Sequence, residues 1–457
     1  MSAPAKVFVV SHTHWDREWY LPFSRFRVRL IDVVEEVLDR LENEDGFEHF
    51  LLDGQAAVLD DYLEVKPADR ERIAALVKAG KLSIGPWFIL SDTFLVSGEA
   101  TVRNLLLGDE VCAEFGGASK AGYVPDAFGH IAQMPQLLSK CGIDSFVYTR
   151  GNGDEIDKLG LEWTWRAPDG SEVLAVHQME GYCNAAALGH EELWHAFTKR
   201  KVDPDRAVAK VRELFEKMDG ESDGRIRLLM NGCDHHPPQR EFGRVLSALR
   251  EAFPETEFVH SDLSSFLEAL RAEGREAKSW SGELRGGKRH PILSGVWSAR
   301  MYLKQANDVC QTLLAGIAEP TLAAAHFLHG RDYPAGTLDA AWRQLLLNHP
   351  HDSICGCSID SVHREMETRF AGVVQTAEQL LIDTTNAIAP SFAPDATDDH
   401  ETAIAVVNPR PVRRTEVVER LVVLQPEGPD WAELGLYDEA GNAVPFEVSE
   451  VHYVERF

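Results

Sequence analysis

Short apolar segments alternate with amphipathic segments over roughly the first 270 residues. The segments KVFVVSH (6–12), FEHFLLDG (47–54) and RIRLLMNG (225–232) have the length and composition of buried strands. Between them, residues 29–43 and 69–80 place apolar side chains at helical spacing, and Gly80 ends the second of these helices. This alternation predicts an α/β domain in which helices cover a parallel sheet or barrel. Polar side chains that follow the strands would then gather at one edge.

The pattern changes after residue 300. Residues 301–389 carry mostly helical spacing, and we expect three helices that are broken at Pro320, Pro334 and Pro350 and form a small bundle. The segment PSFAPDATDDHET (390–402) has the composition of a linker. Beyond it, short apolar runs with turn residues predict strands at the start of a β-domain whose remainder is absent. The predicted domains are therefore 1–275, 276–390 and 400–457.

Composition narrows the classes of partner. The 457-residue chain has 46 Lys and Arg against 73 Asp and Glu, a formal charge of −27, which disfavours nucleic acid and anionic membranes. We find neither a secretion signal nor an apolar run of the roughly 18 residues that span a bilayer. The seven cysteines are scattered and odd in number, so we expect buried thiols in a reducing cytoplasm rather than disulfides. Cys355 and Cys357 could bind a metal, but no second cysteine pair accompanies them.

The first predicted strand ends in VVSHTHWDREWY (9–20), with His12, His14 and Asp16 at every second position. Side chains two apart on a strand point the same way, so the three can converge if the strand continues that far. Imidazole and carboxylate together suit a divalent transition metal, zinc by preference. The alternative is that these residues are hydrogen-bonded polar groups in a loop.

Three further segments combine the same residue types. GYVPDAFGH places Asp126 after a strand, NGCDHHPPQ places Asp234 after another, and NHPHDSICG holds His351 and Asp352 beside a proline. Each acid has an alternative structural role, as a helix cap or a turn residue. The four clusters together favour a site that binds metal and transfers protons.

These segments resemble the signature blocks of glycoside hydrolase family 38, the zinc-dependent retaining α-mannosidases, and are most similar to its bacterial cytoplasmic branch. SHTHWDREW, DGQ (53–55), GPWFILSDTFLVSGE, GYVPDAFGH, NGCDHHPPQ, SARMYLKQAN and NHPHDSICGCSID occur in family order. The resemblance implies a (β/α)7-barrel-like catalytic domain, followed by a helical domain that contributes a metal ligand and by a β-sandwich of which only the start is present.

The resemblance also implies roles for individual residues. One zinc ion would be bound by His14, Asp16, Asp126 and His351, with His12 as a supporting residue that holds a ligand imidazole. Asp126 would be the nucleophile and Asp234 the general acid and base, although many eukaryotic relatives carry two adjacent acids where this chain has Cys233 and Asp234. The sugar would contact Trp19, Phe128, Arg150, Tyr182 and Asp352.

The function that the resemblance implies is that of an exo-acting retaining α-mannosidase acting on manno-oligosaccharides or small mannosides. Zinc would bind the 2- and 3-hydroxyls of the sugar. Bacterial members of the family suggest a homo-oligomer. Two alternatives remain at this point: a hydrolase that uses a zinc-bound water, such as a carbohydrate deacetylase, and a sugar-binding protein without catalysis.

Overall fold

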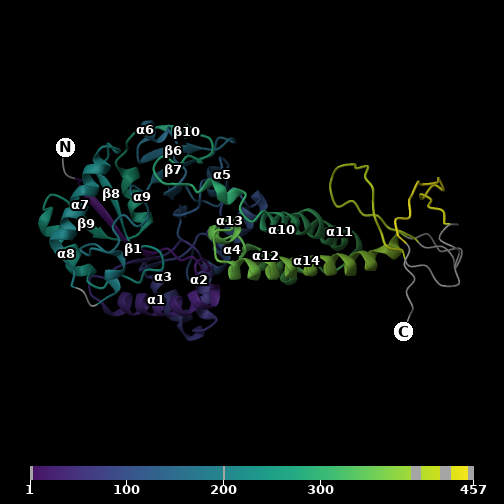
Figure 1. Cartoon of the computed structure of the whole chain (residues 1–457), viewed down its shortest axis with the longest axis horizontal. Helices are drawn as coiled ribbons and strands as arrows, with labels where there is room; N and C mark the ends of the chain where they lie inside the picture. Colours follow the sequence, from purple (N-terminus) through teal and green to yellow (C-terminus); the bar gives the residue numbers. More distant parts are fainter. Residues whose placement is uncertain (1–3, 199–200, 393–402, 423–433, 451–457) are drawn as a thin grey trace. The chain divides into compact units, whose positions relative to one another are not determined.

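The computed structural model describes residues 4–198, 201–392, 403–422 and 434–450, and its strands and helices are labelled in Figure 1. Contacts divide the chain into two units, residues 1–319 with 334–379 and residues 320–333 with 380–457. All the site residues discussed below belong to the first unit. No helix among the described residues is long and apolar enough to cross a membrane.

The strands form two five-stranded sheets. The first has the order β3-β2-β1-β8, with β9 also paired to β1, and the second has the order β10-β6-β7-β5-β4. Every pairing between these strands is parallel except that of β6 with β7. The strands are β1 (Lys6–Thr13), β2 (Phe50–Leu52), β3 (Leu82–Ser83), β4 (Tyr123–Val124), β5 (Ser145–Tyr148), β6 (Glu162–Arg166), β7 (Glu172–His177), β8 (Ile226–Asn231), β9 (Glu257–His260) and β10 (Ser279–Ser281).

Helices alternate with these strands, as the sequence predicts. They are α1 (Phe23–Asn43), α2 (Ala57–Leu63), α3 (Arg70–Lys78), α4 (Gly98–Ala113), α5 (Met134–Lys140), α6 (Ile156–Leu159), α7 (Pro204–Asp219), α8 (Phe242–Ala252) and α9 (Leu263–Ala272). In α1 the residues Phe26, Leu30 and Val37 are buried at helical spacing, which explains why this amphipathic segment packs on the first sheet.

Strand β1 is buried on both faces. Val7 and Val9 belong to one hydrophobic cluster, which includes α1, while Phe8 and Val10 belong to another, which includes α9. A strand covered on both sides has a continuous apolar run, and this is why KVFVV shows no polar alternation. The predicted α/β class with a parallel sheet is confirmed.

The helical region of the first unit contains α10 (Met301–Gln311), α12 (Ala335–Leu346), α13 (His351–Cys355) and most of α14 (Asp360–Ile388). The predicted break at Pro320 is wrong, because a π-helical segment (Thr312–Ala318) joins α10 to α11 (Glu319–His329) without interruption. A wider helical turn before the proline accommodates its ring and missing N–H group.

The strands predicted over 403–422 and 434–450 are not formed. Within these described residues only Tyr437 and Ala443 make an isolated antiparallel bridge. A strand needs a partner for its backbone groups, and these segments are exposed along almost their whole length. The remaining predicted strand residues, 423–433 and 451–457, lie outside the described residues.

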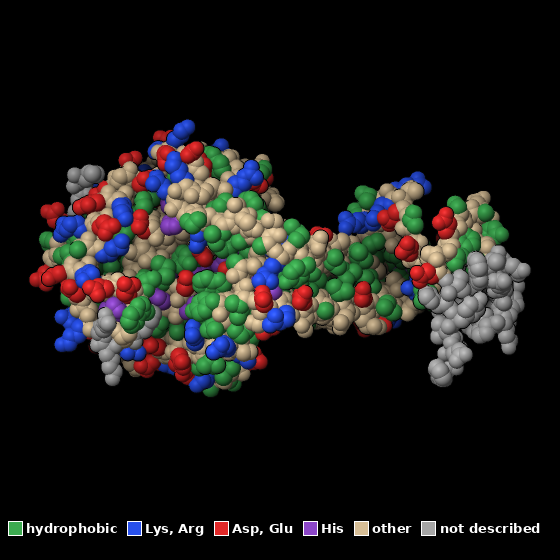
Figure 2. All heavy atoms as spheres, viewed as in Figure 1, with side chains coloured by type: hydrophobic (Ala, Val, Ile, Leu, Met, Phe, Trp, Pro, Cys, Tyr) green, Lys and Arg blue, Asp and Glu red, His purple; other side chains and the backbone are tan. Residues whose placement is uncertain are grey.

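The surface of the first unit carries both signs of charge. On the face shown in Figure 2, acidic and basic side chains are interspersed over the α/β region. Although the formal net charge of the whole chain is −27, the acidic side chains on that face therefore do not form one continuous patch.

Candidate active site

The predicted site residues His14, Asp126 and Asp234 lie where parallel strands end together. Strand β1 pairs with β8 up to Ser11 and Asn231, and beyond the ladder His14 and Asp234 form a parallel bridge. In the second sheet, β4 and β5 pair up to Val124 and Tyr148. Because the carboxyl ends of parallel strands meet at one edge, residues that follow them by equal numbers become neighbours.

Glycine at position 232 allows the chain after β8 to approach β1 closely. A Cβ atom at Gly232 would lie 1.9 Å from the carbonyl oxygen of His12, a distance that no side chain tolerates. The chain after this glycine is held by hydrogen bonds from the His14 amide to the Cys233 carbonyl and from the His235 amide to the His14 carbonyl. This contact positions Asp234 beside His14.

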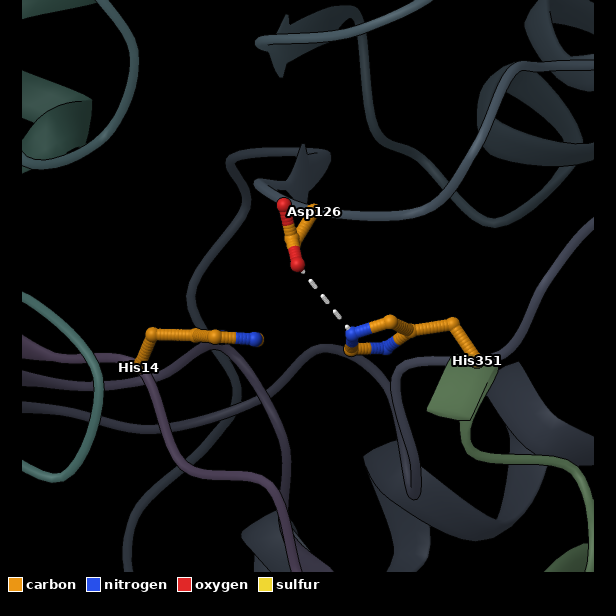
Figure 3. Close-up of side chains that lie close together, drawn as sticks. All are labelled: His14, Asp126 and His351. Carbon is orange, nitrogen blue, oxygen red and sulfur yellow. Dashed lines mark ion pairs between the residues drawn. The ribbon is translucent and has the colours of Figure 1, made fainter. Parts of the chain in front are cut away.

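Three side chains from distant parts of the sequence converge in a buried cluster (Figure 3). One ligand atom each of His14, Asp126 and His351 lies within 4.8 Å of the others. Nε2 of His351 is 3.4 Å from a carboxylate oxygen of Asp126 and 3.4 Å from one of Asp16, and Nε2 of His14 is 3.2 Å from Asp16. The structure therefore brings together all four predicted ligands.

The donor set fits zinc. Nε2 of His14 and Nε2 of His351 are buried, and neither makes a hydrogen bond among the described residues. Two imidazole nitrogens without a hydrogen bond, together with two carboxylates, are the ligand types that zinc accepts in proteins. A second group, Asp16, His351 and Asp352, has the same spacing and contains two of the four predicted ligands, Asp16 and His351.

Asp53 holds the imidazole of His14, a role that the sequence analysis missed. Nδ1 of His14 donates to Oδ1 of Asp53 at 3.0 Å, and the amide of Trp15 donates to Oδ2 at 2.6 Å. We expected His12 to hold a ligand ring, but its Nε2 bonds instead to the Tyr182 carbonyl at 2.8 Å. The available signal was the DGQ segment at the end of β2, whose register with β1 places Asp53 opposite His14.

Asp126 lies between the cluster and a guanidinium group. Nε of Arg150 donates to Oδ1 of Asp126 at 2.7 Å, while the other carboxylate oxygen, Oδ2, faces His351. Burial by itself raises the pKa of Asp126, but the adjacent imidazole of His351 and the charge of Arg150 outweigh it. The pKa therefore lies below its usual value, and the group is an anion at neutral pH.

The pKa of Asp234 is shifted in the opposite direction to that of Asp126. Burial raises its pKa to about 6, and the charges of Asp16 and Asp126 contribute to the rise against the opposing charge of His14. The hydroxyl of Tyr182 donates to Oδ1 of Asp234 at 2.9 Å. Two acids with pKa values shifted in opposite directions are the pattern of a nucleophile and a general acid.

The residues predicted to contact sugar surround the cluster. The Phe128 and His351 rings make a T-shaped contact at a centroid distance of 5.7 Å, and the guanidinium group of Arg150 lies over the Phe128 ring, 5.4 Å from its centroid. Trp19 is half-buried and stacks near His235 at 6.5 Å. Asp352 is buried, and its Oδ1 accepts a hydrogen bond from Cys357 at 3.1 Å.

Glu18 and Arg369 form an ion pair next to the short helix that carries His351. This ion pair was not predicted from the sequence. Glu18 is fully buried, and it accepts a hydrogen bond from Ser353 in α13 at 2.9 Å and pairs with Arg369 in α14. Glu18 lies two residues after Asp16, in the segment that follows β1. The pair therefore connects the segment that carries Asp16 to the helices that position His351.

The cysteine prediction is wrong for two of the seven residues. Cys183 and Cys233 form a disulfide, with Cα atoms 4.8 Å apart and a sequence separation of 50. Their scattered spacing gave no sign of pairing, because the contact arises only when the segments after β7 and β8 lie side by side. Cys112, Cys141, Cys310, Cys355 and Cys357 are free, and of these Cys357 is exposed.

Comparison with known proteins agrees with this geometry. Residues 4–283 match the family model described as "Glycosyl hydrolases family 38 N-terminal domain", and residues 292–388 match the "Alpha mannosidase middle domain". The chain is 38% identical to the solved structure of an alpha-mannosidase from Enterococcus faecalis V583, with a TM-score of 0.78 over 86% of this chain and 44% of that one.

Two curated relatives extend the comparison. A protein of Halalkalibacterium halodurans named "Putative mannosylglycerate hydrolase" is 37% identical over 87% of this chain and 44% of its own length. Human "Alpha-mannosidase 2C1" is 26% identical over 90% of this chain and 37% of its own length. The chain thus spans less than half the length of these relatives. From the signature residues, the shared fold and the two matched domains, we conclude that the chain belongs to glycoside hydrolase family 38.

Proposed function

We propose that this chain is the catalytic portion of a retaining, exo-acting α-mannosidase that hydrolyses manno-oligosaccharides or small mannosides. The observation that carries the proposal is the position of Asp126, which contacts both the histidine cluster and Arg150 while Asp234 keeps a raised pKa nearby. A retaining glycosidase needs one ionised and one protonated carboxyl group on either side of the bond that it breaks.

In the first step, the carboxylate of Asp126 attacks the anomeric carbon of the sugar. The bond from that carbon to the leaving oxygen breaks, and Asp234 gives its proton to this oxygen. Arg150 holds Asp126 in its ionised form, and the hydroxyl of Tyr182 orients the carboxyl group of Asp234. The products are a mannosyl ester on Asp126 and the free aglycone.

In the second step, water attacks the same anomeric carbon. The carboxylate of Asp234 accepts a proton from that water, and the ester bond to Asp126 breaks, which releases mannose with its original anomeric configuration. Asp234 returns to its protonated form and Asp126 to its carboxylate.

The metal, when bound by His14, Asp16, Asp126 and His351, would supply positive charge and coordination positions for the 2- and 3-hydroxyls of mannose. An axial 2-hydroxyl distinguishes mannose from glucose, so this contact would select the sugar. The rings of Trp19 and Phe128 and the carboxyl group of Asp352 would form the remaining wall.

The proposal also covers the leaving group of the substrate, the cellular location of the protein and its oligomeric state. The name of the Halalkalibacterium relative makes mannosylglycerate a substrate to test beside α-linked mannobiose. We also propose a cytoplasmic homo-oligomer, although the cysteine argument for the cytoplasm no longer applies to Cys183 and Cys233.

Hydrolysis of an aryl α-mannoside, measured before and after chelation with metal analysis of the same sample, tests the proposal. We expect about one zinc per chain, loss of activity on chelation, and recovery when zinc is returned. Activity that survives complete removal of the metal would contradict the metal's role.

A slow fluorinated mannoside then separates a mannosidase from a deacetylase that uses zinc-bound water. We expect a mannosyl adduct on Asp126 in the peptide map and α-mannose as the first product by NMR. An Asp126→Ala chain is the control and should remain unlabelled. Release of β-mannose, or hydrolysis without an adduct, would overturn the retaining mechanism.

A further inference from the structure

The disulfide between Cys183 and Cys233 lies directly beside the proposed general acid. The two sulfur atoms and a carboxylate oxygen of Asp234 lie within 4.8 Å of one another. Each cysteine is also the immediate neighbour of one partner in the hydrogen bond between Tyr182 and Asp234. The covalent bond and the hydrogen bond therefore join the same two segments side by side.

Both segments also make hydrogen bonds that do not involve the disulfide. The Tyr182 carbonyl accepts a hydrogen bond from His12, and the side chain of Asn184 accepts one from the amide of Met230 at 2.8 Å. The Cys233 carbonyl accepts a hydrogen bond from the His14 amide at 3.2 Å. These bonds hold the backbone, so breaking the disulfide would shift side chains locally without unfolding the strands.

We propose that the Cys183–Cys233 disulfide is a positioning element for Asp234, and that its reduction weakens proton transfer to the leaving group. The inference rests on the proposed mannosidase function. Two thiols need more space than a bonded pair of sulfurs, and they offer S–H donors that compete with Tyr182 for the Asp234 carboxyl group. A small displacement of a catalytic group can cost as much as about 100-fold in rate.

The disulfide is accessible to small reagents from one side. Cys183 is half-buried, whereas Cys233 is only 6% exposed. A water-soluble phosphine would reduce the bond. The phosphine gives two electrons to the disulfide and becomes a phosphine oxide, whose oxygen comes from water. The two protons of that water are taken up by the two sulfur atoms, which become thiols. Oxidised glutathione reverses the step, because two thiols become a disulfide while one glutathione disulfide becomes two thiols.

The choice of leaving group distinguishes a positioning role from a general structural one. A dinitrophenolate leaves without help from an acid, whereas the sugar alkoxide of mannobiose needs a proton. We therefore expect reduction to lower kcat/KM for α-linked mannobiose by about tenfold. The value for dinitrophenyl α-mannoside should change by less than about twofold, because its leaving group does not depend on Asp234.

The experiment uses the zinc-loaded full chain in its oxidised, phosphine-reduced and glutathione-reoxidised forms. Peptide mapping follows the Cys183–Cys233 bond, and metal analysis shows that zinc is retained in each form. The Cys183→Ser/Cys233→Ser double variant should behave like the reduced chain and no longer respond to either reagent. Cys141→Ser, which removes a free thiol, is the matched control and should respond like the parent chain.

The outcomes separate this inference from the function on which it rests. An equal loss on both substrates, no loss on either, or free thiols at both positions after oxidation would overturn the role of the disulfide and leave the mannosidase proposal intact. If no form hydrolyses dinitrophenyl α-mannoside, the proposed function fails and the disulfide role fails with it.

Discussion

Asp53 accepts a hydrogen bond from Nδ1 of His14 at 3.0 Å, and this contact leaves Nε2 of His14 facing Asp16 and the Asp126–His351 pair. The other oxygen of the same carboxylate, Oδ2, accepts a hydrogen bond from the backbone amide of Trp15 at 2.6 Å. Asp53 itself is fully buried. One acid directly after β2 thus determines which nitrogen of His14 is available to a metal.

Replacing Asp53 with asparagine should weaken metal binding. The variant keeps the size of the side chain but loses the charge that orients the ring and increases its basicity. We expect zinc affinity to fall by about 10–100-fold, as measured by competition with a chelator. Asp262→Asn, which keeps a good cap at the start of α9, is the control and should bind zinc like the parent chain. Unchanged affinity in Asp53→Asn would show that the hydrogen bond does not support the metal.

Replacing the two proposed catalytic acids should change activity on different substrates to different extents. Asp126→Asn removes the nucleophile, so kcat/KM should fall by more than about 10³ on every mannoside. Asp234→Asn should lower kcat/KM for mannobiose by about 10²–10⁴. The kcat/KM for dinitrophenyl α-mannoside should be largely spared, because this value reports the first step and the leaving group needs no proton there. If the two variants lose activity in the same proportion on both substrates, the assignment of Asp234 as the acid is wrong.

Removing Arg369 should destabilise the helix pair that positions His351. Arg369→Ala leaves Glu18 buried with an unpaired charge, and we expect a loss of about 3–5 kcal/mol in the free energy of unfolding. The double variant Glu18→Gln/Arg369→Met removes both charges and should recover much of that loss. Urea denaturation of the three chains measures the difference. A double variant no more stable than Arg369→Ala would show that the uncompensated charge is not the cause.

Histidine burial should make the fold sensitive to acid. Burial lowers the pKa of His260 to about 3, against about 6.5 for an exposed histidine. The unfolded chain therefore binds a proton that the folded chain does not between these values. The stability that the neutral ring contributes is complete above pH 6.5 and is lost as the pH falls toward 3.

The His260→Gln variant tests this linkage. Between pH 6 and 4 the free energy of unfolding of the parent chain should decline more steeply than that of the variant, by about 1.4 kcal/mol per pH unit. Above pH 7.5 the two curves should run parallel, which provides an internal control. Identical slopes across the acid range would mean that His260 takes up its proton without unfolding.

Some parts of the site could be predicted because they depend on local pattern alone. His14, Asp126 and Asp234 each follow an apolar strand, and the rule that parallel strands end together predicted their convergence. His351 was visible in a cluster of polar residues, but its role as a metal ligand came only from the resemblance to a family, since its segment lies in the helical region, more than 200 residues from Asp126. Asp53 was visible in the DGQ segment, but its role depends on the register between β2 and β1.

The sequence by itself determined the order of strands and helices, the burial of β1 on both faces and the types of residue available for a metal and for two acids. Only the tertiary structure decided that Asp53 rather than His12 holds His14, that Glu18 pairs with Arg369 and that Cys183 meets Cys233. The physical reason is that hydrophobic periodicity is a property of neighbouring residues, whereas these contacts depend on which strand ends lie side by side after the sheets have formed.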